Sequence, residues 1–335
     1  MNAIQKLHET GQSLWYDNIH RGLITSGELA AMIGRGDIRG VTSNPTIFNS
    51  AISRSSDYDS AIKPMAWAGW SAEDIFYQLA VEDIRAAADL FRALYEQTQG
   101  GDGYVSLEVS PYLANDTEKT VSEANRLWKM VDRPNLMVKI PATQAGIPAI
   151  RQAIAAGINV NVTLIFSLSR YAMVMDAYLS GLEDRVAQNL PIGSIASVAS
   201  FFVSRVDSKV DQQLERLIRD EGKHAGIAAG LLGKVAIANS QLAYRLFRDH
   251  FGAERYARLK EQGARLQRPL WASTSTKNPA YRDVMYIEQL IAPDTVNTAP
   301  PNTIELFKDH GNVHLSIEGA EDAARKTIPD LDQLG

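Results

Sequence analysis

A chain of 335 residues is long enough to bury a large core, either in one α/β barrel or in two smaller domains. With 45% hydrophobic and 22% charged residues, its composition is that of an ordinary soluble globular protein. The net charge of −5 argues against a general affinity for nucleic acid or anionic membranes, and the absence of cysteine excludes disulfides, thiolate catalysis and cysteine-ligated zinc.

The beginning of the chain carries no recognisable targeting signal. Residues 1–12 lack the apolar core of a signal peptide, and no apolar run in the sequence is long enough to span a bilayer. We therefore expect a cytoplasmic protein with no membrane partner.

Short apolar runs alternate with longer segments of helical spacing along the chain. The apolar runs predict eight strands, at residues 13–17, 38–42, 104–109, 136–140, 158–164, 194–203, 269–274 and 295–298. The other segments predict helices at residues 29–33, 72–98, 115–131, 147–156, 167–189 and 281–291, two or three within 206–267, and a final one that Pro301 and Asn302 open and Gly311 closes.

Several boundaries between these elements have their own signals. Thr25 and Glu28 have the spacing of a capping box ahead of the first predicted helix, and Ser71 can cap the long second one. The Ser-Asn-Pro-Thr sequence at 43–46 breaks the second strand, and the glycine-rich residues 100–103 form a turn before the third.

Eight strands separated by helices favour a (β/α)₈ TIM barrel with extra helices in the long 206–267 connection. A doubly wound open sheet is the alternative, but no G-x-G-x-x-G sequence follows the first strand. No Pro/Gly/Ser-rich linker divides the sequence, so we expect a single barrel domain over residues 1–335.

A single lysine interrupts the apolar stretch from Leu136 to Thr143. Lysine is rarely buried without a partner, so the position of Lys139 near the end of a strand needs an explanation. In apolar surroundings the charged form of the amine is disfavoured, and more free amine is then present to attack a carbonyl. The alternative is a lysine at a strand end whose head group reaches solvent.

Polar residues gather at or just beyond the carboxyl ends of the predicted strands. They are Asp17, Thr42, Asn44, Glu108, Lys139, Asn161, Thr163, Ser200 and Ser273. Each taken alone could be a solvated strand end or a turn former. In a barrel, however, these ends share one mouth, where active sites are built, so the sequence predicts a site around Lys139.

Four segments carry a resemblance to a known family. Residues 39–46 (RGVTSNPT) and 136–146 (LMVKIPATQAG) resemble the two signature segments of the transaldolases, and residues 158–167 (INVNVTLIFS) are similar to the family's fifth-strand motif. Residues 271–279 (WASTSTKNP) resemble the bacterial branch whose members are sometimes fused to glucose-6-phosphate isomerase. The match in kind and order extends from Asp17 to the end of the barrel.

The resemblance implies a class I aldolase-like barrel that needs no cofactor, with Lys139 as the Schiff-base lysine. The family acts in the pentose phosphate pathway. It moves a dihydroxyacetone unit from sedoheptulose 7-phosphate or fructose 6-phosphate to an aldose phosphate, glyceraldehyde 3-phosphate or erythrose 4-phosphate. The resemblance also implies small-molecule sugar phosphates as partners and a homodimer as the assembly, since family members are often dimers.

The matching positions also imply further roles. Asp17 would take the C4 hydroxyl proton, while Glu108, helped by Thr163, would handle a catalytic water, which gives two carboxylates for two proton transfers. The residues that would hold the C1 and C3 hydroxyls of the dihydroxyacetone unit are Asn44 and Asn161, supported by Thr42 and Ser200.

A phosphate site is expected beside the sixth and seventh strands. Residues 200–205 resemble the family's sixth-strand segment, which makes Phe202 and Arg205 substrate-binding candidates. The better-known branch has a second arginine just after the seventh-strand serine, and this sequence has none there. We expect Ser273 and Lys277 to take its place, although Lys277 also fits a solvated loop lysine.

Three rival functions stay open. A related class I aldolase, which releases free dihydroxyacetone or acts on a deoxysugar phosphate, would share the lysine and the barrel. The other two are a non-catalytic sugar-phosphate-binding barrel and a purely structural protein. A metal site is not expected, because Gly311 separates the only histidine pair of suitable spacing, His310 and His314.

Overall fold

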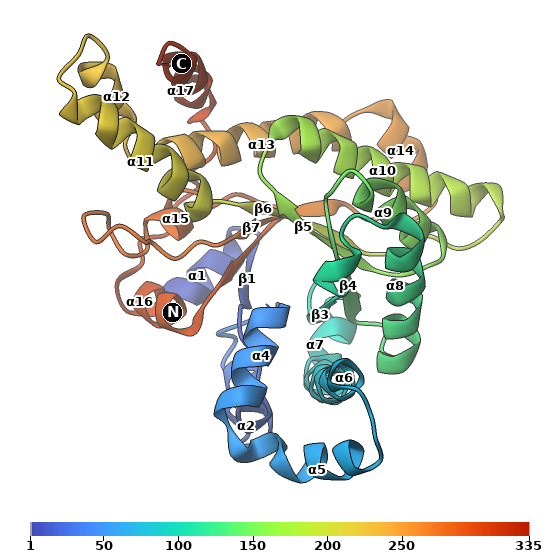
Figure 1. Ribbon diagram of the computed structural model, residues 1–335. Helices are drawn as coiled ribbons and strands as arrows, with labels where there is room; N and C mark the ends of the chain where they lie inside the picture. The colour runs from blue at the N-terminus through green and yellow to red at the C-terminus, as the bar shows by residue number, and fades with distance from the viewer. Residues whose placement is uncertain (1, 335) are drawn as a thin grey trace.

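The computed structural model describes residues 2–334 of the chain, and within them eight parallel strands close into a barrel in chain order (Figure 1). β1 pairs with β2 on one side and with β8 on the other, which closes the ring. The strands are β1 (Gln12–Tyr16), β2 (Gly40–Val41), β3 (Tyr104–Glu108), β4 (Leu136–Pro141), β5 (Val160–Ile165), β6 (Ser197–Phe202), β7 (Gln267–Ala272) and β8 (Thr295–Ala299). The closed ring confirms the predicted (β/α)₈ barrel and excludes the open sheet.

Helices surround the strands (Figure 1). They are α1 (Ala3–Glu9), α2 (Arg21–Thr25), α3 (Glu28–Gly34), α4 (Pro45–Arg54), α5 (Asp59–Trp67), α6 (Ala72–Leu90), α7 (Arg92–Gln97), α8 (Thr117–Val131), α9 (Gly146–Ala155), α10 (Leu168–Ala187), α11 (Ser204–Arg219), α12 (Ala225–Leu231), α13 (Val235–Phe251), α14 (Glu254–Lys260), α15 (Met285–Glu288), α16 (Pro301–His310) and α17 (Glu321–Asp332), with 3-10 turns η1 (Ser56–Tyr58) and η2 (Pro111–Leu113). In Figure 1, α11, α12 and α17 extend from one side of the barrel, and α4 and α5 from another.

Several predicted helices differ from the observed ones. The expected capping box is wrong, because Thr25 lies in the last turn of α2, and α3 instead begins after Gly27, whose φ of 82° suits glycine. The residue 43–46 break is also a helix start: the Asn44 side chain accepts a hydrogen bond from the Ile47 amide, with Pro45 at the first helical position.

Other differences concern helix length and number. The predicted helix at 72–98, capped by Ser71 as expected, divides at Phe91 into α6 and α7. The predicted helix at 281–291 shortens to the four residues of α15, and residues 206–267 hold four helices, α11 to α14. A further helix, α17, follows the one predicted to be final.

Side chains alternate between the barrel interior and the helical layer, and the interior changes character along its axis. Near the amino ends of the strands the interior is apolar, with Trp15, Tyr104, Met137, Val198 and Val296 in one buried cluster. The next inward positions, two or four residues further along each strand, are polar. They are Asp17, Ser106 and Glu108, Lys139, Ser200 and Thr298. The barrel therefore has a sealed end and a polar mouth.

Close packing at the sealed end depends on a glycine in β2. A Cβ atom on Gly40 would lie 2.7 Å from the indole ring of Trp15, closer than carbon atoms approach one another. Glycine at this position lets the Trp15 ring lie against the backbone of the neighbouring strand. The side chain of Trp15 is in consequence fully buried.

One buried carboxylate joins the amino ends of several strands. Asp102 accepts hydrogen bonds from the Ser13 hydroxyl (2.7 Å) and the Trp15 indole (3.2 Å). It also forms ion pairs with Arg39 (3.3 Å) and Arg268 (3.4 Å). Because Asp102 lies just before β3 and its partners come from β1, β7 and the segment before β2, this carboxylate fixes how four strands enter the barrel.

We predict that the nearby His8 makes stability depend on pH. Burial and the positive charges of Arg39 and Arg268 lower the pKa of His8 to about 4. The folded ring stays neutral at pH 5 while the unfolded one is protonated there, so the free energy of unfolding falls as the pH drops. His8→Gln should reduce the loss between pH 7 and pH 5 by about 2 kcal/mol in urea unfolding.

The matched control for this experiment is His314→Gln, since His314 is exposed. The control should lose as much stability as the parent protein over the same pH range. If His8→Gln behaves like the control, the neutral state of the half-buried ring does not contribute to the pH dependence.

Candidate active site

A cavity of about 930 Å³ opens at the carboxyl ends of the strands, near the upper end of the size usual for ligand sites. Of the twelve predicted site residues, the eleven that line it are Asp17, Thr42, Asn44, Glu108, Lys139, Thr163, Ser200, Phe202, Arg205, Ser273 and Lys277. The twelfth, Asn161, is fully buried and hydrogen-bonded to Ser200 on the cavity wall. The fold thus brings the predicted set together from seven strands and their loops.

Lys139 lies at the centre of this set and is only 7% exposed. Its Nζ is 3.2 Å from Glu108 Oε2 and donates a hydrogen bond to the Ser43 carbonyl at 3.2 Å. The expectation of apolar surroundings is therefore wrong for the head group. The apolar neighbours Val138 and Ile140 point to the opposite face of β4, into the helical layer.

Asp17 is held by a pair of threonine hydroxyls. Thr42 donates to Asp17 Oδ1 at 2.7 Å, and its oxygen lies 2.6 Å from the Thr298 hydroxyl. Since Thr42 has one hydroxyl proton and gives it to the carboxylate, Thr298 must be the donor in the second contact. This chain of bonds links the ends of β1, β2 and β8.

A second polar chain lies at the floor of the cavity. The Asn161 amide donates to the Ser106 hydroxyl at 3.0 Å and accepts from the Ser200 hydroxyl at 2.7 Å. Ser43 in turn donates to the Ser106 carbonyl at 2.6 Å. These bonds fix the orientation of the Asn161 amide, because its nitrogen faces Ser106 and its oxygen faces Ser200.

Thr163 and its neighbour Leu164 have unusual local structure. The Thr163 side chain is 1% exposed, and its hydroxyl has no hydrogen-bond partner among residues 2–334. Leu164 has a φ of +61° at an irregularity in the β5–β6 pairing. This left-handed backbone conformation costs a leucine about 1–3 kcal/mol, and such strain is common at functional sites. Because Leu164 also lines the cavity, the strained backbone directs its side chain to the mouth.

Two cations border the cavity beside β6 and β7. The Arg205 guanidinium lies 4.9 Å from the centre of the Phe202 ring, and the Lys277 amine donates to the Ser275 hydroxyl at 2.7 Å. Within residues 2–334 neither cation has a carboxylate at ion-pair distance, so both charges are available to an anion. Ser273 has a φ of +59°, and its hydroxyl lies 2.8 Å from that of Ser204.

Comparison with known proteins bears on this site. A family model described as transaldolase/fructose-6-phosphate aldolase matches residues 14–335. The chain belongs to this family. A transaldolase of Saccharopolyspora erythraea is 51% identical over 333 residues, covering 99% of this chain and 88% of that protein. A transaldolase of Thermobifida fusca is 48% identical over 335 residues, covering 100% of this chain and 89% of that protein.

Another relative is Transaldolase 1 of Streptomyces avermitilis, 46% identical over 333 residues, which are 99% of this chain and 86% of that protein. The family recognised from the sequence motifs is thereby confirmed. In this transaldolase-family barrel the two signature segments supply Thr42, Asn44 and Lys139 to the cavity.

The sequence reasoning missed several residues that hold the site together. They are Ser43, Ser106, Thr298, Leu164 and Phe166, whose ring centre lies 5.1 Å from that of Phe202. For Ser106 a signal existed, because it precedes Glu108 by two residues and so shares its face of the strand. For Leu164 none existed, since its backbone conformation is imposed by the barrel.

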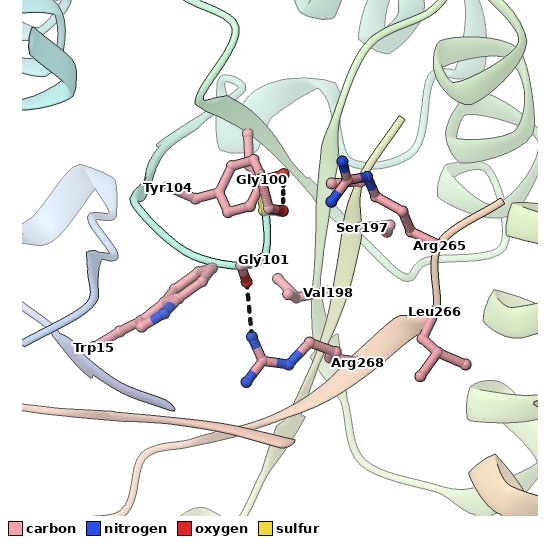
Figure 2. Close-up of a pocket in the computed structure, with 11 residues that line it drawn as sticks. Trp15, Gly100, Gly101, Tyr104, Ser197, Val198, Arg265, Leu266 and Arg268 are labelled. Carbon is pink, nitrogen blue, oxygen red and sulfur yellow. Dashed lines mark hydrogen bonds between the residues drawn. The ribbon is translucent and has the colours of Figure 1, made fainter. Parts of the chain in front are cut away.

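A second, smaller cavity of about 250 Å³ lies at the amino ends of the strands, on the far side of the apolar interior (Figure 2). Trp15, Tyr104 and Val198 line it, together with Arg265 and Arg268. Both arginines donate to backbone carbonyls, as Figure 2 shows for Arg268 and Gly101, so they cross-link strand ends. These hydrogen bonds give both arginines a structural role.

Two features considered in the sequence, the histidine pair and the apolar segments, can be described in the structure. His310 lies 2.9 Å from Asp283 and 3.2 Å from Asp309, and these hydrogen bonds raise its pKa. Residues 2–334 contain no cluster of three metal-ligating side chains. Among the described helices, none has the length and apolar character needed to cross a membrane.

We predict that Ser106 stabilises the fold through Asn161. Ser106→Ala leaves the buried Asn161 amide without its acceptor, which should lower the free energy of unfolding by about 1–2 kcal/mol in chemical denaturation. Ser240→Ala is the matched control, because this equally buried hydroxyl only donates to the Ala236 carbonyl within α13. Equal losses in the two variants would contradict a structural role for the Asn161 chain.

Proposed function

We propose that this transaldolase-family enzyme transfers a dihydroxyacetone unit through a Schiff base on Lys139. The donor is sedoheptulose 7-phosphate or fructose 6-phosphate, and the acceptor is glyceraldehyde 3-phosphate or erythrose 4-phosphate, as in the pentose phosphate pathway. The observation that carries the proposal is a buried lysine 3.2 Å from a carboxylate, with a second carboxylate, Asp17, on the same cavity.

Imine formation is the first part of the reaction. The Lys139 amine attacks C2 of the ketose, and the resulting carbinolamine loses water to become a protonated imine. Glu108 lies close enough to the amine to accept and return protons in these steps. Thr163 lines the same cavity, and its hydroxyl has no hydrogen-bond partner among residues 2–334, so we assign it to the departing water beside Glu108.

Carbon–carbon cleavage follows. Asp17 takes the C4 hydroxyl proton, the C3–C4 bond breaks, its electrons pass into the imine, and the shortened aldose phosphate leaves. The enamine then attacks the acceptor aldehyde, and Asp17 returns the proton. Thr42 and Thr298 support Asp17 by fixing its orientation toward the cavity. Because the imine itself accepts the electrons, the reaction needs no cofactor.

Retention of the three-carbon unit distinguishes a transferase from a simple aldolase. We assign Asn44 and Asn161, supported by Thr42 and Ser200, to the C1 and C3 hydroxyls. The free amide nitrogen of Asn44 favours this role, since its oxygen caps α4. Arg205, beside Phe202, together with Ser273 and Lys277, is assigned to the substrate phosphate, because both cations lack protein counter-ions among the described residues.

We also propose that the chain forms one folded domain over residues 1–335 and that the protein is a cytoplasmic homodimer without a nucleic-acid partner. The continuous barrel across β1 to β8 supports a single domain. Sedimentation equilibrium of the purified chain measures whether it is a dimer.

Trapping of the imine tests the central step. Borohydride reduction in the presence of fructose 6-phosphate should fix a dihydroxyacetone-derived adduct on Lys139, located by peptide mass spectrometry. Lys139→Ala should form no adduct, and Lys139→Arg, which keeps the charge beside Glu108, should also form none. A folded parent protein that gives no adduct with any ketose phosphate would overturn the proposal and favour a non-catalytic sugar-phosphate-binding barrel.

Dependence on the acceptor separates a transaldolase from an aldolase. With fructose 6-phosphate alone, release of glyceraldehyde 3-phosphate should stop after about one equivalent per active site. Addition of erythrose 4-phosphate should restore turnover. Continuous release of free dihydroxyacetone without an acceptor would instead identify the related aldolase.

A further inference from the structure

Asp211 on α11 connects three separate segments. Its side chain is 6% exposed, and it accepts hydrogen bonds from the Tyr281 hydroxyl at 2.7 Å and the Gly233 amide at 3.1 Å. Burial and the hydrogen bond to Asp211 raise the pKa of Tyr281, so its hydroxyl remains a donor. Both carboxylate oxygens of Asp211 are therefore used, one for the loop after β7 and one for the segment before α13.

Asp207, one turn earlier on α11, repeats the arrangement. It accepts from the Tyr286 hydroxyl at 2.8 Å and from the Ala236 amide at 2.7 Å. Burial raises the pKa of Asp207 to about 6, which reflects how little water reaches it. The two aspartates thus form parallel attachments between α11, the loop after β7 and the start of α13.

Packing around Tyr281 requires a glycine. Gly233 has a φ of +67°, and a Cβ atom there would lie 2.8 Å from the Tyr281 ring. The ring therefore lies directly against the backbone that also donates to Asp211. This close contact fixes the ring as well as the hydroxyl.

The other end of the loop is attached to the same helix. The Ser204 amide donates to the Ser273 carbonyl at 2.9 Å, and the hydroxyls of the two residues are 2.8 Å apart. The segment between Ser273 and Tyr281 carries Lys277, and the first turn of α11 carries Arg205. Both ends of the segment are attached to α11, so the position of Lys277 relative to Arg205 depends on these hydrogen bonds.

Lys277 has a second environment within reach. It lines the main cavity and also a smaller one of about 190 Å³ that contains Asp207, Asp211 and Glu215. A lysine released from its loop geometry would be attracted to these carboxylates and away from the substrate phosphate. The attachment of the loop to α11 thus determines whether the Lys277 amine faces the main cavity or the smaller acidic one.

We propose that Tyr281 and Asp211 are positioning residues that hold Lys277 toward the phosphate of the substrate and thereby set the preference for phosphorylated donors. This inference rests on the proposed function, because it concerns the same site. It adds two residues that touch neither the sugar nor Lys139. Their effect is transmitted through the 273–281 segment.

Tyr281→Phe tests the proposal by removing only the hydroxyl. The KM for fructose 6-phosphate should rise about five- to tenfold while kcat changes less than about twofold, because a phosphate contact shared by ground and transition states affects KM. Activity with unphosphorylated fructose should be unchanged. Tyr244→Phe is the matched control, since its hydroxyl donates to the Pro293 carbonyl, away from the site, and it should match the parent protein.

A double-mutant cycle separates positioning from general stability. In a Lys277→Ala background, Tyr281→Phe should change the KM for fructose 6-phosphate by less than about twofold, because the amine that it positions is gone. If Tyr281→Phe does not fold, Asp211→Asn, which keeps the shape but loses one acceptor, takes its place. Additive effects, or equal losses with fructose, would overturn the inference.

The outcome is distinguishable from failure of the proposed function. If imine trapping on Lys139 succeeds while Tyr281→Phe behaves like Tyr244→Phe, only the positioning role is wrong. If trapping fails in the parent protein, the proposed function itself is wrong. A raised KM that is confined to phosphorylated donors supports both.

Discussion

The register between β3 and β4 is the constraint on which the rest of the site depends. Glu108 and Lys139 are direct partners in this parallel pairing, so their side chains emerge side by side into the barrel. A shift of one residue in either strand would turn one of them into the helical layer and leave the other charge buried without a partner. The apolar side chains on the outer face of both strands prevent that shift, because they fill the layer beneath the helices.

The amino end of the barrel contributes to stability, and the carboxyl end carries the candidate reactive groups. At the amino end, Asp102, Arg39 and Arg268 satisfy one another or backbone groups, and the result is a rigid closure. At the carboxyl end, the Thr163 hydroxyl and the charges of Arg205 and Lys277 lack such partners among residues 2–334. Among the described residues, buried oxygens without a partner also occur at the amino end, on Gln12 and Gln267, so it is the two cations without a carboxylate partner that distinguish the mouth and suit it to an anion.

The sequence predicted the strands and their inward polar residues because both depend on a period of two that is local. Lys139, Glu108 and Asp17 could be placed at one mouth from chain order alone. Local patterns failed where long-range geometry decides. The αL backbone of Leu164 lies at an irregularity in the pairing of β5 with β6, and Tyr286 in the short α15 is bonded to Asp207 on a distant helix. Glu108 was expected at the same mouth as Lys139, but its direct contact with the amine was not, since apolar sequence neighbours say nothing about the facing strand.

The two-residue strand β2 also has a consequence for motion. It shares one registered pair with β1 and two with β3, whereas β1 and β8 share five. β7 and β8 also share only two pairs, but β2 has three registered pairs in all, one with β1 and two with β3, and no other described strand has so few, so we expect local unfolding to cost least at β2. Asn44 and α4 directly follow β2. Glu108 and Lys139 lie on β3 and β4, which share four registered pairs. Motion at β2 would therefore reach the reacting amine, because the carbonyl of Ser43, two residues after β2, accepts a hydrogen bond from Lys139.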